Sequence, residues 1–208
     1  MRIEGSGEGS GQGAVEGSIE EYEALPSGLA EQVAALEAQA WPGSSPGHDP
    51  ALAPRAVLLL DAGGRVAASL ALLHKPVRLA DGRTYRAAGL SGVVTRADVR
   101  GRGYGGRLVA AARALLAADP GVDLALFSCD RELVPFYEAA GFEVLPGTVL
   151  VGGTPADPLA TDAPGLDKTV LGAFPTGAAD GEGRADRVRA AFTGIRVPLY
   201  PGTIDRLW

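Results

Sequence analysis

The chain has little of what disulfides, metal sites and membrane spans are built from. Its 208 residues include one cysteine and two histidines, and no apolar run reaches the roughly 18 residues that a transmembrane helix needs. A single cysteine excludes an intrachain disulfide. No cluster of His, Cys and Asp has metal-ligand spacing, so no metal site is predicted. Because no charged and then apolar leader opens the chain, we expect a cytoplasmic protein without a membrane partner.

Positive charge is scarce as well. The formal net charge is −6 and the isoelectric point is about 5.0, so the basic footprint of a nucleic-acid-binding protein is missing. An acidic balance is compatible with a small cationic substrate. Hydrophobic residues make up 46% of the chain, which is ample for a buried core.

Composition divides the chain into a tail and one domain. Residues 1–18 are rich in Gly, Ser and Glu with few large apolar side chains, which predicts a disordered N-terminal tail. Residues 19–208 have the length of a single domain. A stretch rich in Pro and Gly at 152–165 leads into the last segment, so residues 153–208 are predicted to form a C-terminal extension of that domain.

Hydrophobic spacing predicts the secondary structure. Helical spacing appears at Leu25–Trp41, Gly106–Ala118 and Arg131–Ala140. Short apolar runs between turn signals predict the strands Ala56–Asp61, Arg65–His74, Val77–Leu79, Thr84–Ala88, Leu90–Thr95, Val122–Ser128, Phe142–Leu145 and Val149–Gly152. The predicted elements follow the order helix, antiparallel strands and then alternating strands and helices. This order predicts an α+β (mixed α/β) fold.

One segment stands out for its glycines. They recur at positions 101, 103, 105 and 106, between a β-branched run and a helical segment, with Arg100 and Arg102 between them. Glycines let a ligand approach the backbone closely, and the N–H groups at a helix N-terminus favour an anion. The two guanidinium groups would add charge-assisted contacts to the same anion. This pattern predicts a phosphate cradle for a nucleotide-like cofactor.

Spacing narrows the choice of cofactor. A Walker loop needs a lysine after its last glycine, and none follows here. The glycines at 101, 103 and 106 satisfy the dinucleotide pattern G-x-G-x-x-G, with Asp123 near the distance expected of a ribose ligand. The pattern Arg-x-x-Gly-x-Gly from Arg100 to Gly105 fits better.

A second motif follows one helix and one strand later. The segment Phe127–Phe142 contains Tyr-x-x-x-Gly-Phe at the end of a predicted helix. Together the two motifs resemble those of the Gcn5-related N-acetyltransferase (GNAT) superfamily, over residues 56–152. The resemblance implies the acyl-CoA N-acyltransferase fold, a central, mostly antiparallel twisted sheet flanked by helices, and acetyl-CoA as the acetyl donor.

The resemblance also assigns residues to acetyl-CoA. Tyr137 matches the tyrosine that commonly protonates the departing thiolate, a role that a phenol with a pKa of about 10 suits. Asp130 matches a position near the pantetheine. The alternatives are a core aromatic at Tyr137 and an ordinary helix N-cap at Asp130. The other predicted cofactor-binding residues are Val93, Val94, Thr95, Arg100, Gly101, Arg102, Gly103, Tyr104 and Gly105.

A narrower resemblance concerns the acceptor. The segment Gly92–Gly101 and the ending Asp205-Arg206-Leu207-Trp208 are similar to those of the aminoglycoside 2′-N-acetyltransferases, which implies that Asp205 and Trp208 bind an aminoglycoside. Two departures are visible: the spacing from aspartate to tryptophan is one residue longer, and Ser91 stands where that family has an acidic residue. Serine is no general base at neutral pH, but Ser91 can orient a catalytic water.

Position alone adds further candidates. Trp41 and Asp49, with Glu37, lie in the part of the chain predicted to face the acceptor, although Trp41 could equally be a core residue at a helix end. His48 and His74 are isolated and predicted to be structural. Cys129 ends a predicted buried strand and is expected to be inert packing.

The sequence thus predicts acetyl transfer from acetyl-CoA to a primary amine of a small cationic substrate, an aminoglycoside-type antibiotic, by direct attack in a ternary complex. Another amine (a polyamine, an amino acid or a peptide N-terminus) and a non-catalytic module that binds acyl-CoA or the antibiotic are the alternatives. The general base, the length of the acyl group and the choice between monomer and homodimer stay open.

Overall fold

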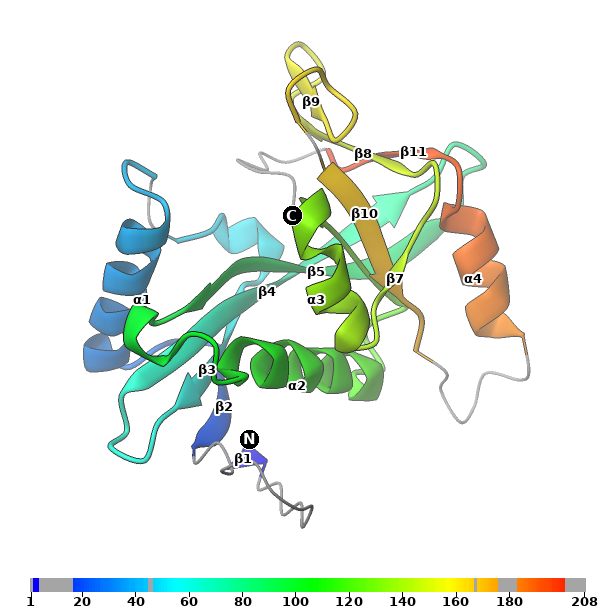
Figure 1. The fold of residues 1–208 in the computed structure, drawn as a ribbon. Coiled ribbons are helices and arrows are strands. Elements are labelled where there is room, and N and C mark those ends of the chain that lie inside the picture. Colours follow the sequence, from blue (N-terminus) through cyan, green and yellow to red (C-terminus); the bar gives the residue numbers. More distant parts are fainter. Residues whose placement is uncertain (1, 4–16, 45–46, 167, 176–182, 201–208) are drawn as a thin grey trace.

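The computed structural model describes residues 2–3, 17–44, 47–166, 168–175 and 183–200, and shows one large sheet flanked by helices (Figure 1). Within these residues the large sheet has eight strands in the order β1-β2-β3-β4-β5-β6-β10-β7, and a smaller sheet has the order β11-β8-β9. All pairs in the large sheet are antiparallel except β5 with β6. The predicted mixed α/β fold with a mostly antiparallel central sheet is therefore confirmed.

The strands are β1 (Arg2–Ile3), β2 (Ser18–Tyr22), β3 (Arg55–Leu60), β4 (Val66–Arg78), β5 (Thr84–Thr95), β6 (Leu124–Asp130), β7 (Glu143–Val144), β8 (Val149–Gly153), β9 (Pro158–Ala160), β10 (Lys168–Ala173) and β11 (Arg196–Pro198). The helices are α1 (Ser27–Ala40), α2 (Tyr104–Ala118), α3 (Val134–Ala139) and α4 (Arg184–Phe192). Among the described residues, 3₁₀ turns cover Pro50–Leu52, Ala97–Val99 and Arg131–Leu133.

The two faces of the large sheet carry separate apolar clusters because side chains alternate along each strand. On one face, Leu36 of α1 packs against Leu58, Leu60, Val66 and Val94. On the other face, α2 and α3 pack against the larger cluster, which includes Leu59, Leu72, Leu108, Leu126 and Tyr137. Figure 1 shows α1 standing apart from α2 and α3. The sheet therefore separates an α1 side from an α2/α3 side.

The parallel pair β5 and β6 is joined only at one end. Ala87 pairs with Leu124 and Ala88 with Ala125. Beyond that point β5 pairs only with β4, and β6 pairs only with β10. The two strands therefore diverge, and their facing edges carry backbone groups that no neighbouring strand of the described sheet uses. We call the space between these edges the β5–β6 wedge.

The long strands differ from the prediction in one respect. Arg65–His74 and Val77–Leu79 were predicted as separate strands, but β4 runs through both, and β5 likewise joins Thr84–Ala88 to Leu90–Thr95. The continuity across Pro76 is possible because β3 pairs with β4 only as far as Leu72, so the missing N–H of the proline lies beyond that ladder. Both predicted turns are present, with Gly64 and Gly82 at positive φ.

Three strands of the described large sheet, β1, β2 and β10, have no counterpart in the sequence prediction. β2 contains Ser18, which was assigned to the disordered tail, and β10 lies within the predicted C-terminal extension. The predicted tail 1–18 lies outside the described residues apart from β1 and residues 17–18. In the described part of the chain, no helix has both the length and the apolar character needed to cross a membrane.

Candidate functional site

The glycine-rich loop joins the open end of the β5–β6 wedge to the N-terminus of α2. Gly101 and Gly103 have φ values of +76° and +79°, and a Cβ atom built on either would meet no atom within 4 Å. The left-handed backbone explains why glycine is needed at both positions, and the space above them is open to a ligand. The first N–H groups of α2, from Tyr104 to Gly106, have no acceptor within the helix. The loop therefore offers backbone donors to an anion.

Gly105 has a different reason to be glycine. A Cβ atom there would lie 2.9 Å from Thr95 Oγ1 and 3.5 Å from Phe136 Cζ. The start of α2 thus packs directly against the end of β5 and against α3, and there is no room for a side chain. This close packing fixes the loop relative to the wedge.

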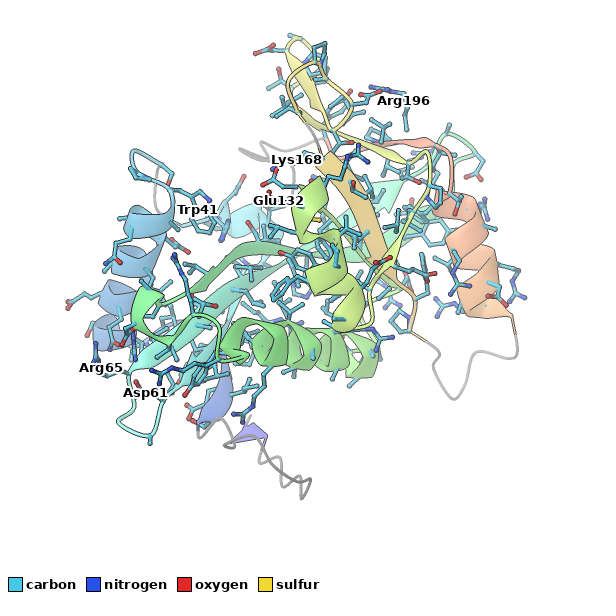
Figure 2. All side chains as sticks on the ribbon, in the orientation of Figure 1. Trp41, Asp61, Arg65, Glu132, Lys168 and Arg196 are labelled. Atoms are coloured by element: carbon cyan, nitrogen blue, oxygen red, sulfur yellow. The ribbon has the colours of Figure 1, made fainter. Side chains whose placement is uncertain are left out.

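Arginine side chains hold the loop in place and give it positive charge. The Arg100 Nε donates to the Thr95 carbonyl oxygen over 3.0 Å, and Arg100 and Arg102 are exposed beside the glycines. Arg96 pairs with Asp98 at 2.7 Å and with Asp61, labelled in Figure 2, at 3.0 Å. These contacts tie the loop to the β3–β4 turn and leave two guanidinium groups next to the proposed anion site.

Asp123 takes no part in this loop. Its carboxylate accepts hydrogen bonds from the backbone N–H and guanidinium of Arg86, both at 2.7 Å, and from Arg184 at 2.8 Å. Arg86 holds the pKa of Asp123 down at about 2. Because this clamp lies at the closed end of the wedge, away from the glycines, Asp123 does not fit the role of a ribose ligand.

Tyr137 lies on the α2/α3 side, near the end of β6. Its ring packs edge-on against Phe127 and Phe136, with centroid distances of 5.0 Å, and the residue is 6% exposed. Burial raises the pKa of Tyr137 well above its usual value, and the neighbouring Cys129 and Asp130 raise it further. The phenol therefore keeps its proton at physiological pH and is suited to donate one.

Asp130 is not a helix cap. Its side chain makes no capping hydrogen bond to the 3₁₀ turn that follows. It pairs instead with Lys168 of β10, labelled in Figure 2, over 2.8 Å. The ion pair lies where β6 ends and the wedge is widest, so the sequence alternative of an ordinary N-cap does not apply.

A β-bulge interrupts β5 next to the wedge. Ser69 pairs with Val94 and Ala71 with Ser91, so Gly92 and Val93 together stand opposite the single residue Leu70. Directly opposed residues of an antiparallel pair point to the same face, which places Ser91 with Ala71 on the α1 side. Gly92 has φ +60°, and a Cβ atom there would lie 3.3 Å from the Glu37 Oε1. The Glu37 carboxylate thus reaches from α1 to the bulge.

A cavity of about 440 Å³ lies on the α1 side, within the size range of small-ligand sites. Most of its wall is apolar. Its polar or ionisable side chains come from four segments that are far apart in the sequence. The lining residues are Tyr22, Glu23, Leu25, Ala30, Val33, Ala34, Glu37, Gly47, His48, Pro54, Ala56, Leu58, Ser69, Leu70 and Ala71.

Ser69 is the most unusual residue of this lining. It is 2% exposed, and its hydroxyl is buried without a hydrogen-bond partner in the described structure. An unpaired buried hydroxyl costs about 1–3 kcal/mol. Such a group next to a cavity points to a partner that binds there.

The structure separates the predicted acceptor residues. Glu37 lines the cavity, whereas Trp41 packs in the apolar cluster of α1 and Asp49 accepts a hydrogen bond from the Ala51 N–H at 2.9 Å. His48, which was predicted to be structural, also lines the cavity. Asp205 and Trp208 lie outside the described residues. His74 packs beside Arg55, its Nε2 2.8 Å from the guanidinium, and burial lowers its pKa.

Sequence reasoning missed Glu23 and Ser69. Glu23 follows β2, a strand that the apolar pattern did not reveal. Ser69 looks unremarkable in an apolar strand, and only the pairing of β3, β4 and β5 brings it beneath α1. The one sequence signal was a polar side chain at a position where the strand is otherwise buried.

Known proteins share this architecture. A family model described as "Acetyltransferase (GNAT) domain" matches residues 21–145. No curated protein matches the chain. A solved structure of the GNAT family N-acetyltransferase YhbS from Escherichia coli in complex with CoA has a TM-score of 0.58 at 17% identity, covering 92% of this chain and 94% of that one.

Two further Escherichia coli structures have similar folds. ElaA has a TM-score of 0.52 at 14% identity, covering 75% of this chain and 98% of that one. The ribosomal-protein-S18-alanine N-acetyltransferase has a TM-score of 0.50 at 14% identity, with 79% and 98% covered. At these identities the structural likeness shows the fold, while the family model covers more than half of the chain.

Proposed function

The chain belongs to the GNAT acetyltransferase family, and from this premise we propose that it transfers the acetyl group of acetyl-CoA to a primary amine bound on the α1 side of the sheet. It is an acetyltransferase, and acetyl-CoA is its acetyl donor. The observation that carries the proposal is the divergence of β5 and β6 beyond Ala88 and Ala125, directly next to a glycine-rich helix N-terminus.

The described residues fit coenzyme A. The open space over Gly101 and Gly103 would be filled by any Cβ, and the adjacent N–H groups suit a pyrophosphate. Arg100 and Arg102 supply positive charge beside it. The unused strand edges of the wedge suit the amide groups of a pantetheine arm, which pair with backbone as an added strand would.

Acetyl-CoA supplies an activated thioester, and the protein supplies position and protons. The Gly92–Val93 bulge is proposed to hold the thioester carbonyl, because the bulge interrupts the ladder of β5 with β4 beside the wedge. Tyr137 is proposed to protonate the departing thiolate from the α2/α3 side, since its raised pKa keeps the phenol protonated. The amine would approach from the α1 side, where the cavity and Ser91 lie. Ser91 is proposed to orient a water there.

Direct transfer is proposed because the cysteine of the chain does not suit an acetyl-enzyme. Cys129, the only cysteine of the chain, is 5% exposed, and burial raises the pKa of its thiol to about 11. A thiol rather than a thiolate is present at neutral pH, and a thiol is a poor nucleophile. Acetyl-CoA and the amine are therefore proposed to react directly in a ternary complex.

The acceptor predicted from the sequence resemblance is an aminoglycoside, with Asp205 and Trp208 as its ligands. Both residues lie outside the described structure, so the support for this acceptor is the sequence resemblance. Polyamines, amino acids and peptide N-termini are the alternative amines, and binding without turnover is the alternative function.

The test is thiol release from acetyl-CoA in the presence of single amines, with the acetylated amine identified by mass spectrometry. We expect release to depend on the amine and to match the acetylated product one to one. Binding of acetyl-CoA without release by any aminoglycoside, polyamine, arylalkylamine, amino acid or peptide would favour a binding module.

A further inference from the structure

The cavity on the α1 side has two kinds of wall. Its body is formed by apolar side chains of the α1-side cluster, including Leu25, Val33 and Leu58. The titratable side chains of its lining are the carboxylates of Glu23 and Glu37, with Tyr22 and His48. A large apolar surface with few charged groups recognises a ligand that is itself mostly apolar.

Resting on the proposed function, we propose that the acceptor is a monoamine with an apolar body, and that Glu37 takes the proton of its ammonium group. The apolar wall packs against the body of the amine. The Glu37 carboxylate lies at the β5 bulge, as its distance of 3.3 Å from a Cβ built on Gly92 shows. The amine nitrogen is thereby brought to the same bulge that borders the wedge.

Ser69 supports the assignment independently. Its hydroxyl is sealed and unpaired at the floor of the described cavity, two ladder positions from Ser91. A bound amine or an accompanying water would give it the partner that it lacks. Ser69 and Glu37 thus give the cavity a polar side toward the bulge, where Ser91 lies on the same face of the sheet.

The same lining is unfavourable for an acceptor that carries several positive charges. Each ammonium group that leaves water needs a partner, and an apolar wall provides none. A molecule with more ammonium groups than the carboxylates of Glu23 and Glu37 can pair would have to bury the others against apolar side chains such as Leu58. One ammonium group directed at Glu37 avoids this penalty.

The chemical step balances with these groups. The ammonium group loses a proton to Glu37, and its nitrogen lone pair forms the new bond to the thioester carbonyl carbon. The carbon–sulfur bond breaks, the sulfur receives a proton from Tyr137, and the nitrogen loses its second proton through water, which restores the proton of Tyr137. Glu37 releases its proton to water, and the products are an N-acetylamine, coenzyme A and one proton.

The first experiment compares 2-phenylethylamine, spermidine and kanamycin as acceptors. We expect kcat/KM for 2-phenylethylamine to exceed both others by at least about tenfold, since small differences in apolar contact change this ratio by such factors. Preferred acetylation of kanamycin or spermidine would overturn the apolar acceptor while leaving the proposed function intact.

The second experiment separates Glu37 from the other carboxylates of α1. Glu37→Gln should lower kcat for 2-phenylethylamine by about 100-fold, the usual size of general-base catalysis, with acetyl-CoA binding unchanged. Glu31→Gln, an exposed change on the same helix, is the matched control and should leave kcat unaltered. An equal kcat in both variants, or an unchanged pH profile in Glu37→Gln, would remove Glu37 from the reaction.

Binding without turnover tests the cavity even if no amine is acetylated. Calorimetry of 2-phenylethylamine should show binding to the wild type and at least about tenfold weaker binding to Ala34→Trp, which fills the cavity from α1. Ala35→Trp, exposed and outside the lining, is the control. Binding without acetylation would contradict the proposed function and keep the cavity assignment, whereas no binding to the wild type would overturn the assignment.

Discussion

The Asp123 carboxylate accepts three hydrogen bonds from Arg86, from its backbone N–H and Nη2 at 2.7 Å each and from its Nε at 3.2 Å. This clamp joins β5 to the start of β6 at the closed end of the wedge. One residue further on, Ala87 and Leu124 begin the two-residue ladder, and beyond it the strands diverge. The clamp therefore sets the point from which the binding space opens.

Replacing Asp123 by Asn should destabilise the protein. Arg86 lowers the pKa of Asp123 from 3.8 to about 2, so its ionised form stabilises the fold above about pH 4, and this contribution is lost as the pH falls toward 2. Because solvent screens the partly exposed arginines, we expect the free energy of unfolding to fall by about 1 kcal/mol at pH 7. Urea unfolding of the wild type and of Asp123→Asn at pH 7 and near pH 2 measures the difference in the free energy of unfolding.

The difference between wild type and Asp123→Asn should shrink toward zero near pH 2. Asp157→Asn is the control, because that carboxylate is exposed and lies in a turn of the smaller sheet. A difference that stays constant with pH would show that charge is not the basis of the clamp.

Gly105→Ala should disturb both stability and cofactor binding. The new methyl group would lie 2.9 Å from Thr95 Oγ1 and 3.5 Å from Phe136, so we expect a loss of about 1–3 kcal/mol in the free energy of unfolding. Because the loop would shift, acetyl-CoA should bind more weakly. Gly28→Ala in α1 meets no atom within 4 Å and should instead raise stability by about 0.5–1 kcal/mol. Denaturant unfolding of both variants gives the comparison.

Arg100→Ala should weaken acetyl-CoA binding. A charge-assisted hydrogen bond contributes about 1.5–3 kcal/mol, so the Kd from calorimetry should rise by at least about tenfold. The exposed Arg78 at the far end of β4 offers a matched Arg→Ala control. An unaltered Kd in Arg100→Ala would exclude this arginine from the anion site.

Tyr137→Phe should lower kcat by about 100-fold and leave the Kd of acetyl-CoA within about twofold. The ring contacts with Phe127 and Phe136 survive the change, so the fold should be kept. Because burial raises the pKa of Tyr137 above 10.0, the wild-type kcat should show no loss from this group up to about pH 10. An unchanged kcat in the variant would mean that Tyr137 only packs the core.

Local patterns predicted the helices α1, α2 and α3 and the glycine-rich loop, but α4 was missed. The spacing of Leu29, Val33, Leu36 and Ala40 predicted α1 and the face that packs on the sheet, because a helix buries residues three and four apart. The apolar spacing after the glycines predicted α2, which begins two residues earlier than expected, at Tyr104.

Non-local pairing explains what was missed. β10 is only six residues long. It is held in the sheet by pairing with β6, whose residues lie about forty positions earlier in the chain. The cavity is likewise a product of distant segments: Glu23, Glu37, His48 and Ser69 meet only once α1 covers β3 and β4. The spacing of side chains along one segment cannot predict contacts between segments that are far apart in the sequence.

The most direct test of the central claim is one reaction in which acetyl-CoA, 2-phenylethylamine and the wild-type protein are mixed and both products are quantified. The account predicts equal amounts of free coenzyme A thiol and N-acetylated amine, with the rate reduced about 100-fold in Tyr137→Phe. Thiol release that is independent of the amine, or acetyl-CoA binding with neither product from any amine tested, would contradict it.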